Sequence, residues 1–152
     1  MKLAEALILR ADCQKRIEQL RQRLVRSAKV QEGETPPENP QVLLVELEIK
    51  LNELVDLIKR INKTNSQTII QETMTVSDAL AQRDIFLLKR SVYGSLIDEA
   101  TPNSNRYSQS EIKFLSTVNI SELQTQMDQL SRDCRELDMK IQASNWQIEL
   151  VD

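Results

Sequence analysis

The sequence contains no histidine, and only two glycines, two cysteines and four prolines occur among its 152 residues. Histidine is the commonest general base and metal ligand at neutral pH, so the usual hydrolytic and metal-binding arrangements are missing. Carboxylate metal sites in helical bundles depend on Glu-x-x-His pairs, which are also absent. The two glycines stand alone, so there is no glycine-rich phosphate loop. We therefore predict a protein that is not an enzyme, without cofactor, metal ion or catalytic residue.

Aromatic residues are scarce too, at 3% of the chain. Sandwiches and barrels need many turns and favour aromatic and β-branched residues in their strands. Leu, Ile, Gln, Glu and Arg are instead abundant, and helices accept all of them. The composition predicts a mainly α fold, and the length suits a single helical domain over residues 1–152.

No apolar run is long enough to span a membrane, and the apolar stretch Leu7–Leu9 is too short for a signal peptide. We therefore expect a cytoplasmic protein. Cys13 and Cys134 both lie at helical spacing among apolar residues, which favours buried thiols over a disulfide.

Apolar residues repeat at spacings of three and four in two long segments. The first comprises Leu44, Leu47, Leu51, Leu54, Ile58 and Ile61. The second comprises Ile120, Leu123, Met127, Leu130, Cys134, Leu137 and Ile141. Such spacing keeps one face of a helix against a partner helix. Because these stripes are more continuous than a monomer needs, we predict self-association as a homo-oligomer, beginning with a two-fold dimer and consistent with coiled-coil packing.

Four long antiparallel helices are expected, over residues 2–29, 41–62, 76–100 and 120–143, in a four-helix arrangement. Asn39 followed by Pro40 is a good start signal for the second helix. The third helix has the least regular stripe, with charged residues interrupting it. Its apolar members are Val76, Ala79, Leu80, Leu87, Leu88, Val92, Leu96 and Ile97.

A minor β element is expected from short strands near residues 68–71, 112–118 and 146–150, where β-branched or alternating apolar residues occur. The connection before the fourth helix leaves the topology open. Residues 101–111 reach about 36 Å when extended, close to the length of a 25-residue helix. Both a simple turn between neighbouring helices and a crossover that gathers the three strands are compatible with this length.

Charge is unevenly distributed although the net charge is only −3. Residues 2–29 hold eight basic and three acidic side chains, whereas residues 120–152 hold three basic and seven acidic ones. Complementary rims on neighbouring helices, within one chain or across a dimer, explain this pattern best. Weak polyanion binding through the face Lys15–Lys29 is an alternative, but the small net charge gives no expectation of a nucleic-acid partner.

Five polar or aromatic residues are candidates for a partner or interface site. Arg83 and Asp84 interrupt the third stripe and would form a polar pocket or an inter-subunit ion pair, or else simply face solvent. Arg106 and Tyr107 lie in the second long loop, where they would grip a carboxylate or phosphate, unless Tyr107 packs over a helix end. Trp146 is either an interface anchor or a plug at the end of the bundle.

Several phrases occur in the order KLAEALILRADCQKRIEQLRQRL, AKVQEGETP, LIKRINKTN, ALAQRD, RYSQSEIKF and ASNWQIEL. As a set they resemble a septicolysin-like family of small bacterial proteins. The resemblance implies an α-helical fold, assembly into oligomers and a cytolysin-like, pore-forming activity, with no site residues to carry over. Pore formers need an apolar helix or strands of about ten alternating residues. Because the chain offers neither, a soluble structural or interaction protein is the expected function, ahead of a membrane-active one.

Overall fold

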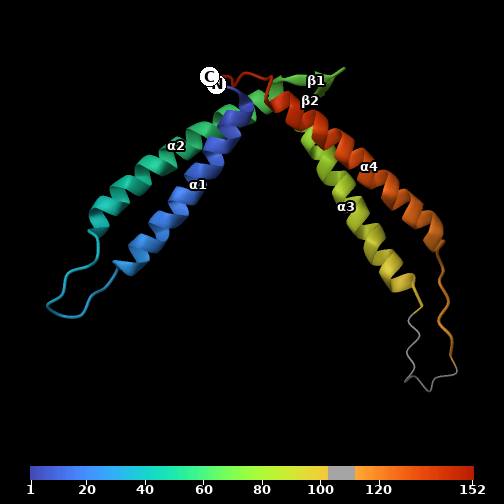
Figure 1. Ribbon diagram of the computed structural model, residues 1–152, viewed down its shortest axis with the longest axis horizontal. Helices are drawn as coiled ribbons and strands as arrows, with labels where there is room; N and C mark the ends of the chain where they lie inside the picture. Colours follow the sequence, from blue (N-terminus) through green and yellow to red (C-terminus); the bar gives the residue numbers. More distant parts are fainter. Residues whose placement is uncertain (103–111) are drawn as a thin grey trace. The chain divides into compact units, whose positions relative to one another are not determined.

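The computed structural model describes residues 1–102 and 112–152, and this part of the chain forms four long helices and one small sheet (Figure 1). The helices are α1 (Leu3–Arg26), α2 (Pro40–Gln67), α3 (Val76–Ala100) and α4 (Ile120–Asn145). The strands are β1 (Ile69–Gln71) and β2 (Met74–Thr75). The prediction of a mainly α fold with long helices and a minor strand element is confirmed.

Two compact units divide the chain: unit 1 is Met1–Val76 with Gln142–Asp152, and unit 2 is Ser77–Ile141. Each unit is built around one pair of helices, α1 with α2 and α3 with α4. The single domain over residues 1–152 stays a prediction.

In unit 1, α1 and α2 run antiparallel, as contacts at two positions along the helix pair show. The Cys13 thiol donates a hydrogen bond to the Lys50 carbonyl at 3.2 Å, and Arg23 bonds Glu38 just before α2 begins. The packed side chains of α1 repeat at spacings of three and four. They are Leu3, Ala6, Arg10, Cys13, Ile17, Leu20 and Leu24, all buried or half-buried. The apolar residues of α1 that share this spacing therefore form its packed face, and Arg10 lies among them.

The packed stripe of α2 differs from the one that the sequence predicts. It consists of Leu43, Leu47, Lys50, Leu54, Leu57, Ile61 and Thr64. Leu44 and Leu51, expected inside, are 46% and 40% exposed. The predicted and the observed repeats share Leu47, Leu54 and Ile61. The observed repeat can include Lys50, because the aliphatic stem of this lysine packs while its ammonium group bonds Glu53 at 2.6 Å.

Local hydrogen bonds determine where α2 begins and how the chain continues beyond its end. The Asn39 side chain accepts a bond from the Gln41 amide at 2.9 Å, which is the predicted start. The helix continues to Gln67 rather than ending near residue 62. It is succeeded by β1, which pairs antiparallel with β2 through Ile69 and Thr75. Of these two strands the sequence indicated only the first.

The last residues of the chain lie against the start of α1, closing one end of unit 1. The Leu3 amide donates to the Ile148 carbonyl at 2.9 Å, and the Leu150 amide donates to the Met1 carbonyl at 2.8 Å. The strand expected near residues 146–150 is thereby reduced to a single bridge between Lys2 and Glu149. Its apolar side chains still help to fill the core, which clusters Leu3, Ala6, Ile61 and Leu150.

In unit 2, α3 and α4 are antiparallel neighbours. Arg83 bonds Asp138 at 3.0 Å, and a Cβ at Gly94 would lie 3.6 Å from the Met127 methyl carbon. On α4, the predicted stripe from Ile120 to Ile141 is buried or half-buried throughout. The end of α3 therefore lies near the start of α4, which excludes a crossover along the helices.

The strand expected at residues 112–118 does not form, although these residues are all described. Ile112, Phe114 and Leu115 are 75%, 87% and 84% exposed. A strand needs a neighbour to satisfy its backbone groups, and alternation in the sequence cannot show whether a neighbour exists. That prediction is wrong for this physical reason.

Candidate interaction surface

The described residues contain neither a metal-binding group nor a membrane-spanning helix. Within residues 1–102 and 112–152, no group of three or more Cys, Asp or Glu side chains is placed to hold a metal ion. No helix in these ranges is long and apolar enough to cross a membrane. Both cysteines are free thiols, with Cys13 buried and Cys134 half-buried.

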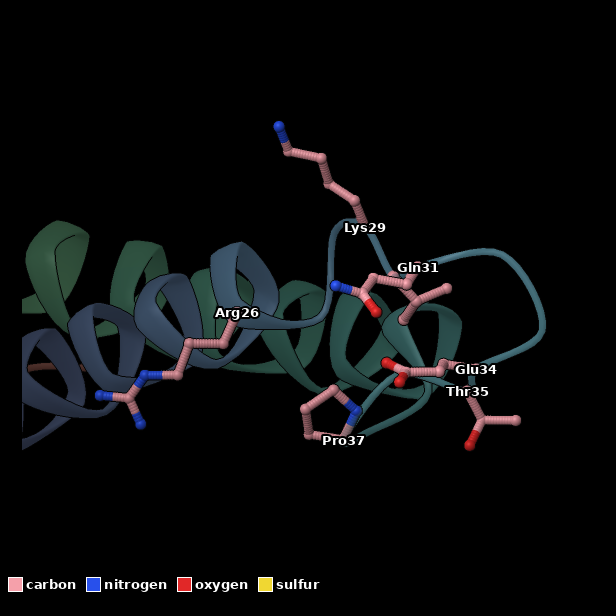
Figure 2. Close-up of a pocket in the computed structure, with 7 residues that line it drawn as sticks. Arg26, Lys29, Gln31, Glu34, Thr35 and Pro37 are labelled. Atoms are coloured by element: carbon pink, nitrogen blue, oxygen red, sulfur yellow. The ribbon is translucent and has the colours of Figure 1, made fainter.

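A hollow of about 610 Å³ lies beside the turn between α1 and α2 (Figure 2). It is lined by Arg26, Lys29, Val30, Gln31, Glu34, Thr35 and Pro37. Figure 2 shows the ends of the Arg26 and Lys29 side chains pointing away from each other. The two positive groups therefore do not converge on one ligand position, as an anion site would require.

The positive charge of α1 is partly compensated inside unit 1. Arg23 donates two hydrogen bonds to Glu38, at 2.9 and 2.6 Å, and lies 3.8 Å from Glu46. The bond from Arg23 holds the pKa of Glu38 below its usual value. Arg21 pairs with Glu18 at 3.3 Å. The acidic partners of Arg23 thus come from α2 and the loop before it, and polyanion binding by this face stays a prediction.

A second charged cluster joins the two ends of the chain. Glu149 pairs with Lys2 and, at 3.3 Å, with the N-terminal amine of Met1, and these hydrogen bonds lower its pKa. Nearby, Arg60 bonds the Asp152 carboxylate at 3.0 Å. Sequence reasoning missed this cluster because its partners lie more than ninety positions apart and no local pattern relates them.

Of the candidate residues, Arg83 and Asp84 lie on α3 in unit 2. Arg83 occupies the face against α4, where it pairs with Asp138 at 3.0 Å and lies 3.5 Å from Asp84. Arg83 is thus held within the chain, whereas the Asp84 side chain is 69% exposed. Trp146, just after α4 and in unit 1, is 58% exposed. Arg106 and Tyr107 lie outside the described residues.

The outward face of α3 is apolar, and we call it the α3 face. It comprises Ile85, Leu88, Val92 and Leu96, which are 55%, 60%, 57% and 40% exposed. Spacings of three and four place these side chains on one side of the helix, roughly opposite Val76, Arg83 and Gly94. In the sequence the two faces of α3 look like one irregular stripe, so the expectation that Leu88, Val92 and Leu96 pack within the bundle is wrong.

Charged residues flank the α3 face on both sides. Helical geometry places Asp84 on one edge and Lys89 on the other. The Lys89 ammonium lies 5.5 Å from the centre of the Tyr93 ring, in cation–π contact. An apolar centre between charged edges is the usual anatomy of a protein–protein contact.

The chain belongs to a family of unknown function, DUF6847, whose family model matches residues 10–150. A crystal structure of a functionally unknown conserved protein from Corynebacterium diphtheriae is similar, with 46% identity, a TM-score of 0.93 and coverage of 99% of each chain. No curated protein matches. The resemblance to septicolysin-like proteins is therefore wrong: neither finding points to that family, and the pore-forming expectation rested on it.

Proposed function

We propose that this member of the DUF6847 family is a non-enzymatic, cytoplasmic protein that works by self-association, as a structural or protein-interaction component. The α3 face carries this proposal. Four large apolar side chains, each 40% to 60% exposed, line the side of one helix that its neighbour α4 does not cover.

Packing physics supports a protein partner for this face. Helices that are apolar on more than one side are normally covered on more than one side. Large contiguous apolar patches on proteins mark sites of interaction. Closed two-fold dimers are the commonest oligomers, and they use the same surface on both subunits. A second copy of this chain is therefore the simplest partner for the α3 face, because no other protein is needed.

The cytoplasmic location is proposed from the cysteines. Cys13 is a buried free thiol whose hydrogen goes to the Lys50 carbonyl, and Cys134 is free as well. Thiols persist in a reducing compartment, which is the condition that the cytoplasm provides.

The test is the solution mass by size-exclusion chromatography with light scattering, over a range of protein concentrations. We expect a fixed multiple of 17.5 kDa for the natural sequence. Leu88→Glu, which places a charge in the α3 face, should shift the mass towards the monomer. Gln126→Glu is the matched control, because it adds the same charge at an exposed position of α4 and should leave the mass unchanged.

A monomer at every concentration would contradict the proposal. An oligomer that Leu88→Glu leaves intact would show that self-association uses another surface.

A further inference from the structure

The order of residues on the α3 face resembles that of a two-stranded parallel helix pair. Ile85 and Val92, seven residues apart, are β-branched, and Leu88 lies between them. Parallel two-stranded packing favours β-branched side chains at one of its two contact positions and leucine at the other. Ala81 continues the pattern one turn earlier, also at an exposed position.

The charged edges of the α3 face are complementary in this orientation. Asp84 immediately precedes the contact position of Ile85, and Lys89 comes directly after that of Leu88. In a parallel pair, such flanking residues meet across the contact when they are five positions apart, as Asp84 and Lys89 are. In an antiparallel pair centred on Leu88, Lys89 would instead lie near Lys89 of the other copy, where like charges repel.

We infer that α3 packs in parallel against α3 of a second copy, around a two-fold axis along the helices, with Asp84 of each copy paired to Lys89 of the other. This inference rests on the proposed self-association and adds its geometry. Ile85, Leu88 and Val92 would each contact the same residue of the other copy and form the centre of the seam. Two ion pairs would fix its direction.

The contacts within one copy leave both charged groups available for this exchange. The Asp84 side chain is 69% exposed and 3.5 Å from Arg83, whose stronger bond goes to Asp138 at 3.0 Å. Lys89 is exposed and rests on the Tyr93 ring. The same repeat places Asp78 one step before Ala81 and Ser95 one step after Val92. The apolar seam therefore runs from Ala81 to Val92 and spans about three turns.

Cysteine cross-linking tests the direction of the pair. In a parallel pair Val92 lies beside Val92 of the other copy, so Val92→Cys alone should give a disulfide-linked dimer under mild oxidation. In an antiparallel pair Val92 would face Ile85, so only a mixture of Ile85→Cys and Val92→Cys chains would link. Gln126→Cys on α4 is the matched control, and the natural sequence gives the background from Cys13 and Cys134.

Charge reversal tests the ion pairs independently of the cysteines. Asp84→Lys should raise the dimer dissociation constant about tenfold, since two exposed ion pairs become two repulsions. Adding Lys89→Asp to that variant restores opposite charges at both places, so the constant should return to within about threefold of its natural value. Circular dichroism checks that each variant keeps its helices.

The outcomes separate this inference from the proposed function. A dimer by mass that links through Val92→Cys and is restored by the double reversal supports the parallel pair. A dimer that links only in the Ile85→Cys and Val92→Cys mixture, or at neither position, overturns the parallel pair and leaves self-association standing. A monomer at all concentrations overturns both.

Discussion

Two neighbouring leucines near the start of α2 differ sharply in their surroundings, and this difference predicts opposite sensitivities to the same substitution. Leu43 is 2% exposed, whereas Leu44 is 46% exposed. We expect Leu43→Ala to lower the free energy of unfolding by about 3 kcal/mol, the sum of lost burial and the cavity left behind. Leu44→Ala should lower it by about 1 kcal/mol or less, because half of that side chain already meets water and no enclosed cavity forms.

The assay is denaturant unfolding of both variants and the natural sequence at one protein concentration, because self-association would otherwise change the apparent stability. A difference of about 2 kcal/mol between the variants corresponds to roughly 4–8 °C in Tm for a chain of this length. If Leu44→Ala were as damaging as Leu43→Ala, or more so, then α2 would be packing through the stripe that the sequence predicts. The observed register would then be refuted.

Three further predictions concern the glycines, a helix cap and an ion pair. Gly94→Ala should raise stability by about 0.5–1 kcal/mol in thermal melts, because helix propensity improves and the new Cβ meets only a side chain at 3.6 Å. Gly33→Ala should lower it by about 1 kcal/mol, since Gly33 has φ +84°; equal effects of the two would contradict this. Asn39→Ala should lower the free energy of unfolding by about 1 kcal/mol through loss of the α2 cap, and an unchanged denaturant midpoint would argue against that role. Because the pKa of Glu149 is lowered in the folded chain, its contribution is present above the unfolded pKa near 4.3 and is lost as pH falls through the folded pKa. Glu149→Gln should therefore flatten the fall in Tm below about pH 4.3, and parallel curves would rule out a role for the Lys2 pair.

Helix content and one whole packing face could be predicted from the sequence because their signals are local. The stripe of α4 runs from Ile120 to Ile141 without a competing repeat, and it is the face that packs. On α2 two repeats overlap, and only the partner helix decides between Leu43 and Leu44. Hydropathy alone could not favour the repeat that contains Lys50, since it treats lysine as polar whatever its stem contacts.

The candidate site shows the same limit. Arg83 was expected either to form a polar pocket or an inter-subunit ion pair, or to face solvent. It lies on the packed face of α3, where Asp138 supplies a partner from 55 positions away in the same chain. With Arg83 on the face against α4, Leu88 and Val92 lie on a second, separate apolar face of α3. They are not irregular members of the packed face. The sequence contains both stripes, but their separation depends on which side α4 covers.

The pairing of the chain's two ends has a consequence for synthesis. Unit 1 is discontinuous: its first 76 residues lack the segment Gln142–Asp152 until that segment has been translated. The Leu3 amide and the apolar surface around Ile61 cannot meet Ile148 and Leu150 before then. Unit 2, in contrast, is one continuous stretch of chain, so all of its residues are made before Ile148 and Leu150. Unit 1 should thus be completed only after all of unit 2 has been made, and loss of a few residues from the segment Gln142–Asp152 should damage the fold at the start of α1.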